Sequence, residues 1–147
     1  MIGVAVIAHE SLADALIRCV THVLGSRPAQ FESLTIGSHD EAFKLLPQAG
    51  KLVAALDSGE GVLILSDIYG ATPCNLACKL LVPGKVEVVT GVSLPMLVRA
   101  FTYRDRGLSM MVSKATSVRC GPWWNSTKVR ASMRSAKAMA SDTVACP

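Results

Sequence analysis

Two side chains capable of nucleophilic or acid–base chemistry follow two of the most apolar runs in the chain. His9 comes directly after IGVAVIA (residues 2–8), and Asp67 comes directly after GVLILS (residues 61–66). A carboxylate that accepts a hydrogen bond from one ring nitrogen fixes the histidine tautomer and leaves the other nitrogen its lone pair. That nitrogen is a nucleophile near neutral pH. The pair therefore predicts a reactive imidazole, provided that the fold brings the two residues together.

The segment SDIYGATP (residues 66–73) indicates what such a histidine would attack. Gly70 and Ala71 permit close approach of the backbone, and Thr72 is the expected N-cap of a helix with Pro73 at its first position. A helix N-terminus presents unpaired N–H groups and the positive end of the helix dipole, which suits a phosphate. The turn therefore predicts a phosphoryl-binding site at the start of this helix.

Each of these residues also has an ordinary structural interpretation. A histidine at a strand end often caps or simply faces solvent, Asp67 can cap a loop, and Thr72 can begin a helix without any chemistry. His22 and His39 are expected to be surface or capping residues. The functional interpretation thus depends on whether the side chains converge in space.

Four apolar runs of strand length alternate with helical patterns. The runs span residues 2–8, 31–37, 61–66 and 85–91, and the helical patterns span residues 11–25, 39–59, 72–81 and 93–103. This alternation predicts an α/β fold with a mainly parallel open sheet, helices on both faces and the flavodoxin-like strand order 2-1-3-4. In such sheets the ligand site lies beyond the carboxyl ends of the strands, between the first and third strands. His9 and Asp67 would meet there.

Details of the helices follow from the same pattern. In residues 11–25 the expected buried stripe ends before Gly25 and consists of Leu12, Leu16, Cys19, Val20 and Val23. Pro47 and Gly50 predict a kink in the second helix or its division into two pieces. Cys74 and Cys78 are four positions apart and share one helix face, where they could bind a metal or be small buried thiols. No second pair of His or Cys residues has the spacing of a zinc site. We therefore expect no metal and no cofactor.

Composition and charge limit the class of protein. The 147 residues are 50% hydrophobic and 18% charged, which is typical of a globular domain. No apolar run approaches the roughly 20 residues that span a bilayer, so we expect a cytoplasmic protein without direct membrane insertion. The net charge of +4 arises in residues 114–147, which hold six Lys or Arg against a single acid, so nucleic-acid binding is not expected.

Three segments together resemble the EIIA domain of the mannose-type, phosphoenolpyruvate-dependent sugar phosphotransferase system. They are GVAVIAHESLADAL, GVLILSDIYGATPCNLA and VEVVTGVSLPMLVRA, and the resemblance covers residues from about 2 to about 105. It implies a dimeric cytoplasmic phosphocarrier whose histidine, here His9, accepts a phosphoryl group from the phosphocarrier protein HPr and passes it to an EIIB partner. It also implies that Asp67 orients the ring and that Thr72 and Ser93 occupy phosphoryl-binding positions.

The sequence departs from that family in three places. Glu10 stands where the family tends to have glycine, and its charge would disfavour a bound phosphoryl group unless it faces solvent. Ser93 stands where the family often has asparagine. The composition changes abruptly near residue 114, so we predict an EIIA-like domain over residues 1–113 and a divergent basic tail over residues 114–147, which is disordered or arises from a reading-frame change.

Other functions fit the same residues. A regulatory EIIA-like protein would signal its phosphorylation state to a partner without transport, and a related phosphotransferase subunit serves dihydroxyacetone kinase. SDIYGATPCN matches the sugar-system pattern better than the pattern of that subunit. An anion-binding α/β domain without phosphoryl transfer is the remaining alternative.

Overall fold

The sheet that the sequence predicts is present in a computed structural model, which describes residues 1–118. Four parallel strands are hydrogen-bonded in the order β2-β1-β3-β4, as expected. They are β1 (Gly3–His9), β2 (Phe31–Ile36), β3 (Val62–Ser66) and β4 (Val86–Thr90). Strands β1 and β3 thus lie side by side at the centre, and their carboxyl ends meet at one edge.

Burial of the strands explains their residue patterns. Every residue of β3 is buried, and so is every residue of β1 except His9, because helices cover both faces of these central strands. Strand β2 lies at an edge and alternates between buried and more exposed residues. Strand β4 forms the other edge and is mostly half-buried. The uninterrupted apolar runs therefore belong to the centre of the sheet.

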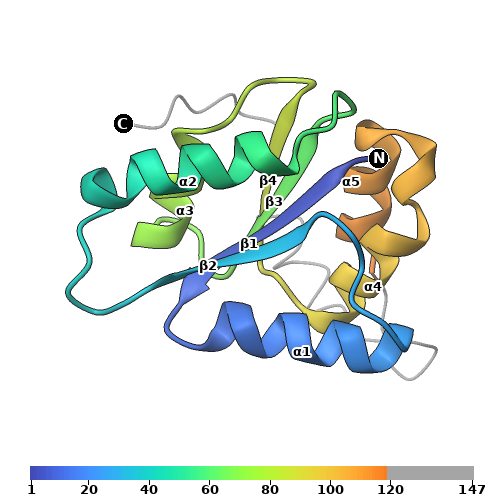
Figure 1. Cartoon of the computed structure of the whole chain (residues 1–147), viewed down its shortest axis with the longest axis horizontal. Coiled ribbons are helices and arrows are strands. Elements are labelled where there is room, and N and C mark those ends of the chain that lie inside the picture. The colour runs from blue at the N-terminus through green and yellow to red at the C-terminus, as the bar shows by residue number, and fades with distance from the viewer. Residues whose placement is uncertain (119–147) are drawn as a thin grey trace, which may run out of the picture.

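Helices cover the two faces of the sheet in separate groups (Figure 1). One face carries α1 (Leu12–Leu24), α4 (Leu94–Thr102) and α5 (Leu108–Thr116). The other face carries α2 (Ala42–Leu56) and α3 (Thr72–Cys78), and a short 3₁₀ helix, η1 (Arg104–Arg106), joins α4 to α5. Among these elements no helix is long and apolar enough to cross a membrane.

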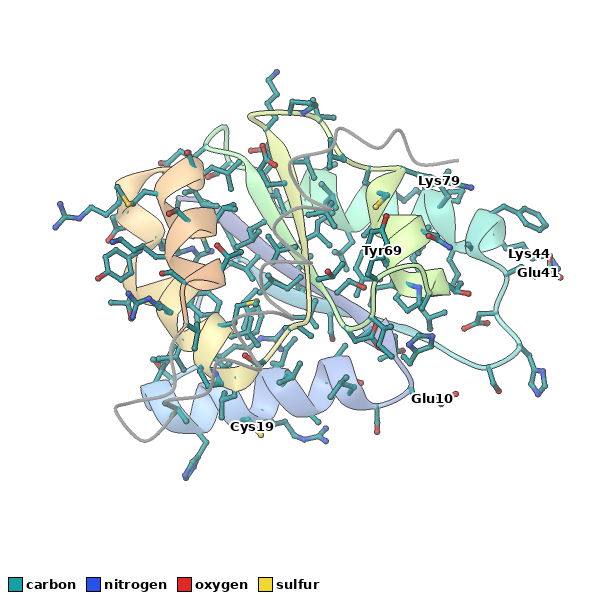
Figure 2. All side chains as sticks on the ribbon, turned by 180° about the vertical axis from the view of Figure 1, so that it is seen from behind. Glu10, Cys19, Glu41, Lys44, Tyr69 and Lys79 are labelled. Carbon is teal, nitrogen blue, oxygen red and sulfur yellow. The ribbon has the colours of Figure 1, made fainter. Side chains whose placement is uncertain are left out.

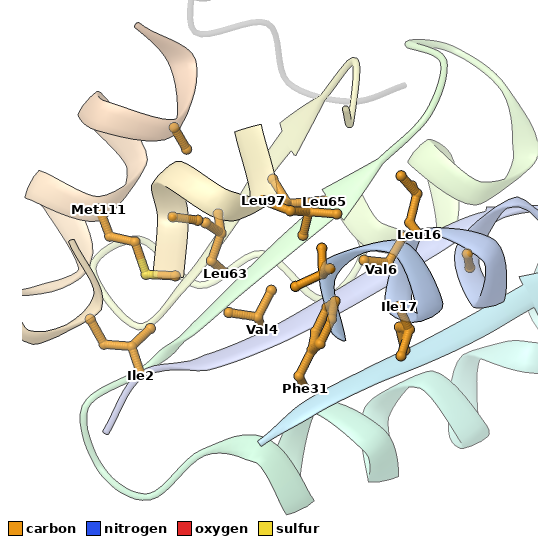
Figure 3. Packing of buried hydrophobic residues seen from close by; sticks show 14 of the residues in the cluster. Ile2, Val4, Val6, Leu16, Ile17, Phe31, Leu63, Leu65, Leu97 and Met111 are labelled. Carbon is orange, nitrogen blue, oxygen red and sulfur yellow. The ribbon is translucent and has the colours of Figure 1, made fainter. Parts of the chain in front are cut away.

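Two hydrophobic clusters, one on each face, hold the layers together. The cluster under α1, α4 and α5 includes the side chains labelled in Figure 3. The rings of Phe31 and Phe101 pack edge to face there, with their centroids 4.8 Å apart. The cluster under α2 and α3 includes Ile7, Ile64 and Leu76. Because β1 contributes side chains to both clusters, it is anchored along its whole length up to His9.

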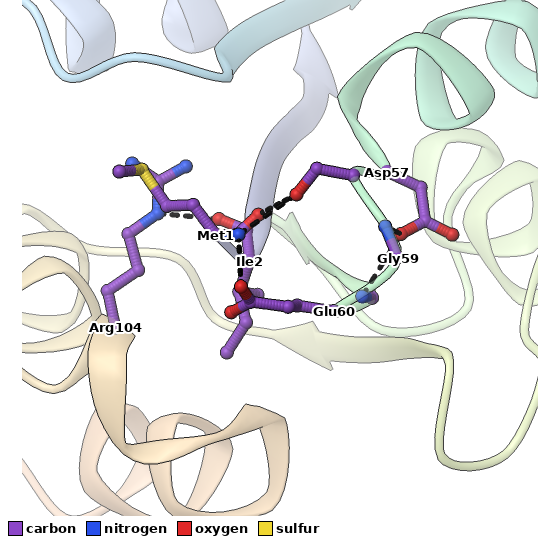
Figure 4. A network of polar contacts seen from close by, with 8 residues as sticks. Met1, Ile2, Asp57, Gly59, Glu60 and Arg104 are labelled. Carbon is purple, nitrogen blue, oxygen red and sulfur yellow. Dashed lines mark hydrogen bonds and ion pairs between the residues drawn. The ribbon is translucent and has the colours of Figure 1, made fainter.

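Polar contacts close the end of the sheet opposite His9 (Figure 4). The guanidinium of Arg104, only 6% exposed, donates hydrogen bonds to the carbonyl oxygens of Ile2, Ala29 (2.7 Å) and Gln30 (3.2 Å). The amino group of Met1 forms an ion pair of 2.6 Å with Glu60. Side-chain hydrogen bonds and an ion pair therefore stabilise the amino-terminal edge of the sheet. These contacts leave the carboxyl edge uncovered.

Two local expectations were wrong, and a third was wrong in part. Helix α2 is one helix with Pro47 inside it and is not divided, because the burial of Ala49, Val53 and Leu56 keeps its second half on the sheet; a kink at Pro47 remains a prediction. In α1 the buried stripe is rotated by one position: Ala13, Leu16, Ile17 and Val20 face the sheet, and the side chains at the two ends of the expected stripe are exposed. Thr72 is the first residue of α3, and Ala71 is its N-cap.

The predicted division near residue 114 remains a prediction. Helix α5 runs through residue 114 to Thr116, and the description ends at residue 118. The rest of the segment 114–147 lies outside the described residues.

Candidate functional site

The side chains of His9 and Asp67 are in direct contact although they are 58 positions apart in sequence. His9 is the last residue of β1, and Asp67 directly follows β3, which pairs with β1 in parallel up to the Ile7–Ser66 pair. The distance between His9 Nδ1 and Asp67 Oδ2 is 2.7 Å, which is typical of a charge-assisted hydrogen bond. The adjacency of two central strands therefore creates the pair.

The Asp67 carboxylate is fixed by further hydrogen bonds. Its Oδ2 accepts the backbone N–H of His9 at 2.9 Å, and its Oδ1 accepts the N–H of Ile68 at 2.8 Å. Burial opposes ionisation of this side chain, which is only 8% exposed, but the hydrogen bonds from His9 and Ile68 outweigh it and hold the pKa of Asp67 below its ordinary value. The carboxylate is thus ionised at neutral pH.

This contact determines which ring nitrogen of His9 is open. An ionised carboxylate can only accept, so Nδ1 carries the proton that Asp67 binds. Neutral imidazole then has its lone pair on Nε2. The His9 side chain is 40% exposed, against 8% for Asp67, so an incoming group can reach Nε2. The arrangement presents a nucleophilic nitrogen to solvent on a rigid strand end.

The loop after β4 is joined to the same edge. Gly91 N–H donates to the Asp67 carbonyl at 2.9 Å, and Val92 N–H donates to the Ser66 carbonyl at 2.9 Å. Ser93 is the N-cap of α4, and its Oγ accepts the Met96 N–H at 3.3 Å. Because that bond uses Oγ as an acceptor, the Ser93 hydroxyl still has a proton to donate.

The turn before α3 has the open backbone that the sequence predicts. Gly70 has φ +80°, a conformation that favours glycine, and no atom lies within 4 Å of the position a Cβ would take. The Asn75 side chain donates to the Gly70 carbonyl at 3.2 Å and steadies the turn. Within residues 1–118, the N–H groups of Gly70 and Thr72 have no hydrogen-bond partner. The turn therefore has two backbone donors available.

Glu10 is the residue whose setting sequence reasoning missed. Its φ is +49°, a left-handed conformation that a residue with a Cβ adopts at a cost of about 1–3 kcal/mol. Its Oε1 accepts the Ser38 N–H at 3.1 Å, and its own N–H donates to the Ile36 carbonyl at 3.0 Å. Figure 2 shows Glu10 in the turn between β1 and α1. The positive φ explains why glycine suits this position.

Two exposed apolar side chains were also missed. Ile68 and Tyr69 follow Asp67 directly and are 62% and 66% exposed. Tyr69 lies on the loop before α3 (Figure 2). Apolar residues in a loop between two well-defined elements are a signal for a contact surface, and SDIYGATP contains that signal.

Within the described part of the chain, the remaining histidines and cysteines do not join this site. His22 and His39 are exposed, on α1 and on the loop before α2. The Sγ atoms of Cys74 and Cys78 lie 3.9 Å apart on α3, with Cys74 buried. Throughout residues 1–118, no three His, Cys, Asp or Glu side chains are placed to hold a metal ion.

Fold and site together define a class: an open parallel α/β sheet with an oriented histidine at the switch between its first and third strands. Comparison with known families narrows this class. Residues 3–118 match the EIIA-man family, described as "PTS system fructose IIA component". The chain belongs to this family.

Individual relatives agree with that assignment. The mannose-specific EIIAB component of the phosphotransferase system from Escherichia coli K12 is 29% identical over 121 residues, which is 82% of this chain and 37% of that protein. The chain thus spans little more than a third of the length of the curated relatives it matches.

Solved structures share the fold. The phosphotransferase component EIIA from Streptococcus agalactiae has a TM-score of 0.69 at 21% identity, covering 78% of this chain and 89% of that one. The mannose/sorbose-specific IIA subunit from Enterococcus faecalis has a TM-score of 0.66 at 18% identity, covering 81% and 93%. At these identities the likeness establishes the architecture alone.

Proposed function

We propose that this protein is a cytoplasmic phosphocarrier of a sugar phosphotransferase system, with His9 as its phosphoryl acceptor. One observation carries the proposal: the 2.7 Å contact between His9 Nδ1 and Asp67 Oδ2, which leaves Nε2 as the exposed nucleophile. Membership of the EIIA-man family supports HPr as the donor, an EIIB component as the acceptor and a homodimer as the assembly.

The transfer step requires little more than position and charge. The Nε2 lone pair attacks the phosphorus of the donor phosphohistidine, and the donor N–P bond breaks with its electron pair returning to the donor ring. The His9 ring becomes more positive as the new N–P bond forms. The Asp67 carboxylate, bound to Nδ1–H, stabilises that charge without taking the proton.

Backbone and hydroxyl donors at the edge would bind the phosphoryl oxygens. We assign this role to the turn Gly70, Ala71 and Thr72 and to the Ser93 hydroxyl. Gly70 and Thr72 have N–H groups without partners within the described chain, whereas the Ala71 N–H is already shared weakly with the Ile68 carbonyl at 3.4 Å. Gly70 and Thr72 are therefore the principal donors of the turn in this proposal.

A labelling assay tests the function. Incubation with phosphoenolpyruvate, enzyme I and HPr should add one phosphoryl group to the wild-type protein, detected by intact mass. The His9→Ala variant should remain unlabelled, because it lacks the nucleophile. His22→Ala is the matched control and should label like wild type, since His22 is an exposed histidine on α1 outside the site. Labelling of His9→Ala would refute the assignment.

A further inference from the structure

We propose that Glu10 is a charge that weakens the hold of His9 on its phosphoryl group, so that the loaded protein discharges readily. The inference rests on the proposed function, since it concerns the phosphorylated state of His9. It deepens that function by naming a residue that sets the transfer equilibrium. Glu10 acts through space and through the loop that it binds, so it is a positioning and tuning residue and not a catalytic one.

The first observation is where the Glu10 carboxylate lies. His9 pairs with Ile36 across β1 and β2, and Ser38 follows Ile36 by two residues. The Glu10 side chain is exposed, but its Oε1 accepts the Ser38 N–H at 3.1 Å, so the carboxylate is held beside the carboxyl end of β2. Asp67 approaches His9 from β3 on the other side. The histidine is thus flanked by two carboxylates.

The second observation is that this charge has no neutralising partner. Within residues 1–118 Glu10 forms no ion pair, and Lys44, in the first turn of α2, is paired with Glu41 at 3.2 Å. Figure 2 shows Glu41 and Lys44 together at the start of α2. Asp40 on the same loop is also negative and accepts the Gly37 N–H at 2.7 Å. The loop of residues 37–41 therefore contains two acids and no lysine or arginine.

The third observation is that the backbone keeps Glu10 in place. Its φ of +49° and the bond from its N–H to the Ile36 carbonyl fix the turn, and the carboxylate bond to Ser38 closes a ring of contacts between the β1–α1 turn and the β2–α2 loop. The negative charge is therefore fixed near the end of β1, where it disfavours a phosphoryl group on His9.

A charge-only substitution tests the inference. Glu10→Gln removes the charge, while its amide oxygen can still accept the Ser38 N–H. A phosphoryl group carries a charge of about −1.5 to −2 at neutral pH, so removing one nearby carboxylate charge should raise the phosphorylated fraction relative to the unphosphorylated one about threefold to tenfold. High salt should shrink this factor towards one, because about 1 M salt screens charges beyond about 3 Å.

The measurement uses phosphoramidate, a small donor that needs no partner protein. The donor P–N bond breaks, ammonia leaves with the electron pair after protonation, and Nε2 forms the new bond. Isotope-labelled wild type and an unlabelled variant share one tube with phosphoramidate and ammonia, and intact mass gives both phosphorylated fractions at equilibrium. Glu87→Gln is the matched control: its carboxylate also accepts a backbone N–H, that of Gly84 at 2.9 Å, but at the start of β4, on the far edge of the sheet.

The outcomes separate the two proposals. A raised fraction for Glu10→Gln at low salt that falls at high salt, with Glu87→Gln at the wild-type value, is the expected result. Glu10→Gly should show the same rise, because it removes the same charge. Wild-type labelling with no rise for Glu10→Gln, or a rise that salt does not reduce, overturns the role of Glu10 alone. Absence of any label on wild-type His9 overturns the phosphocarrier function and the role of Glu10 with it.

Discussion

At the scale of single residues, the proposed chemistry depends on one carboxylate that accepts hydrogen bonds from three donors. Asp67 accepts hydrogen bonds from the His9 ring, the His9 backbone N–H and the Ile68 backbone N–H. In the proposed function it therefore orients the nucleophile and also fixes the end of the strand. Its ionised state is essential to both roles, because only the carboxylate fixes the proton on Nδ1. Changes at this position should therefore affect transfer and stability together.

Asp67→Asn should slow phosphoryl transfer to His9 about tenfold to a hundredfold. An amide can donate a hydrogen bond to Nδ1, which favours the tautomer that carries its proton on Nε2 and has no lone pair there. It should also lower the free energy of unfolding by about 1–2 kcal/mol, since hydrogen bonds to a charged acceptor become neutral ones. Rapid-quench labelling and urea denaturation measure the two effects. Asp57→Asn is the control: it also accepts two backbone N–H groups, from Gly59 and Gly61, and should leave transfer unchanged.

The stability difference between wild type and Asp67→Asn should depend on pH. The pKa of Asp67 is lowered in the folded protein, so its contribution is fully present above the ordinary value of 3.8 and is lost as the pH falls through the folded value. The difference should shrink as the pH falls below about 4. Denaturation series at each pH from 5 to 2 test this, and a difference that grows below about pH 4 would contradict the ionised carboxylate.

Single residues also show how far sequence reasoning reaches. The convergence of His9 and Asp67 could be predicted, because both directly follow buried runs and the rule for parallel sheets places strands 1 and 3 together. The conformation of Glu10 could not, since a glutamate gives no sequence signal for a positive φ, and its contact with Ser38 joins positions 28 apart. Thr72 was misplaced by one position because a Thr-Pro pair indicates a helix start only to within a residue.

At the scale of elements, the loop between β3 and α3 combines the site with an exposed apolar surface. Asp67 opens the loop, Gly70 has positive φ, and between them Ile68 and Tyr69 extend into solvent. Any protein partner that brings a phosphoryl group to His9 Nε2 must cover this loop, because it adjoins the histidine. The loop should therefore contribute to partner affinity and not to the chemistry itself.

Tyr69→Ala should raise the partner concentration that gives half-maximal transfer about tenfold, since an aromatic anchor in an interface is commonly worth more than 1 kcal/mol. Labelling by phosphoramidate should stay at the wild-type rate, because the small donor does not need the surface. Steady-state transfer from HPr at varied concentration measures the effect. Leu81→Ala removes an apolar side chain of 43% exposure after α3 and serves as the control. An equal loss with both donors would contradict a docking role.

The elements differ in how well their sequence patterns identify them. The strands were predicted to within one residue at each end, because β1 and β3 are buried on both faces and leave no ambiguity of period. The stripe on α1 was wrong because Leu12 and Val23 are apolar but exposed, and periodicity alone does not separate them from Ala13 and Ile17. Pro47 does not divide α2 into two pieces, because packing on the sheet holds both halves of the helix together.

At the scale of the whole molecule, the amino and carboxyl ends of the strands differ in their contacts. The amino-terminal edge is closed by Arg104, whose guanidinium links the carbonyls of Ile2, Ala29 and Gln30 and lies over the Phe101 ring at 5.3 Å. The carboxyl edge carries His9, Asp67 and the open turn before α3. Stability and chemistry are thus concentrated at opposite ends of the same central strands.

Arg104→Met should lower the free energy of unfolding by about 2–4 kcal/mol, because three backbone carbonyls lose their donor in a buried position. The folded fraction should still label on His9, since the change lies at the far edge of the sheet. Arg106→Met, an exposed arginine in the same short helix η1, should cost less than about 0.5 kcal/mol. Urea denaturation compares the two, and an equal cost for both would contradict the role of Arg104.

The nitrogen that carries the phosphoryl group tests the central claim most directly. The 2.7 Å bond from Nδ1 to Asp67 leaves only Nε2 open, so the phosphorylated protein should contain His9 modified at Nε2. Long-range ¹H–¹⁵N NMR spectra of the ¹⁵N-histidine-labelled protein, recorded before and after phosphorylation, distinguish the two ring positions. A phosphoryl group on Nε2 of His9 is the predicted result. Modification at Nδ1 of His9, or at another residue, would contradict the account.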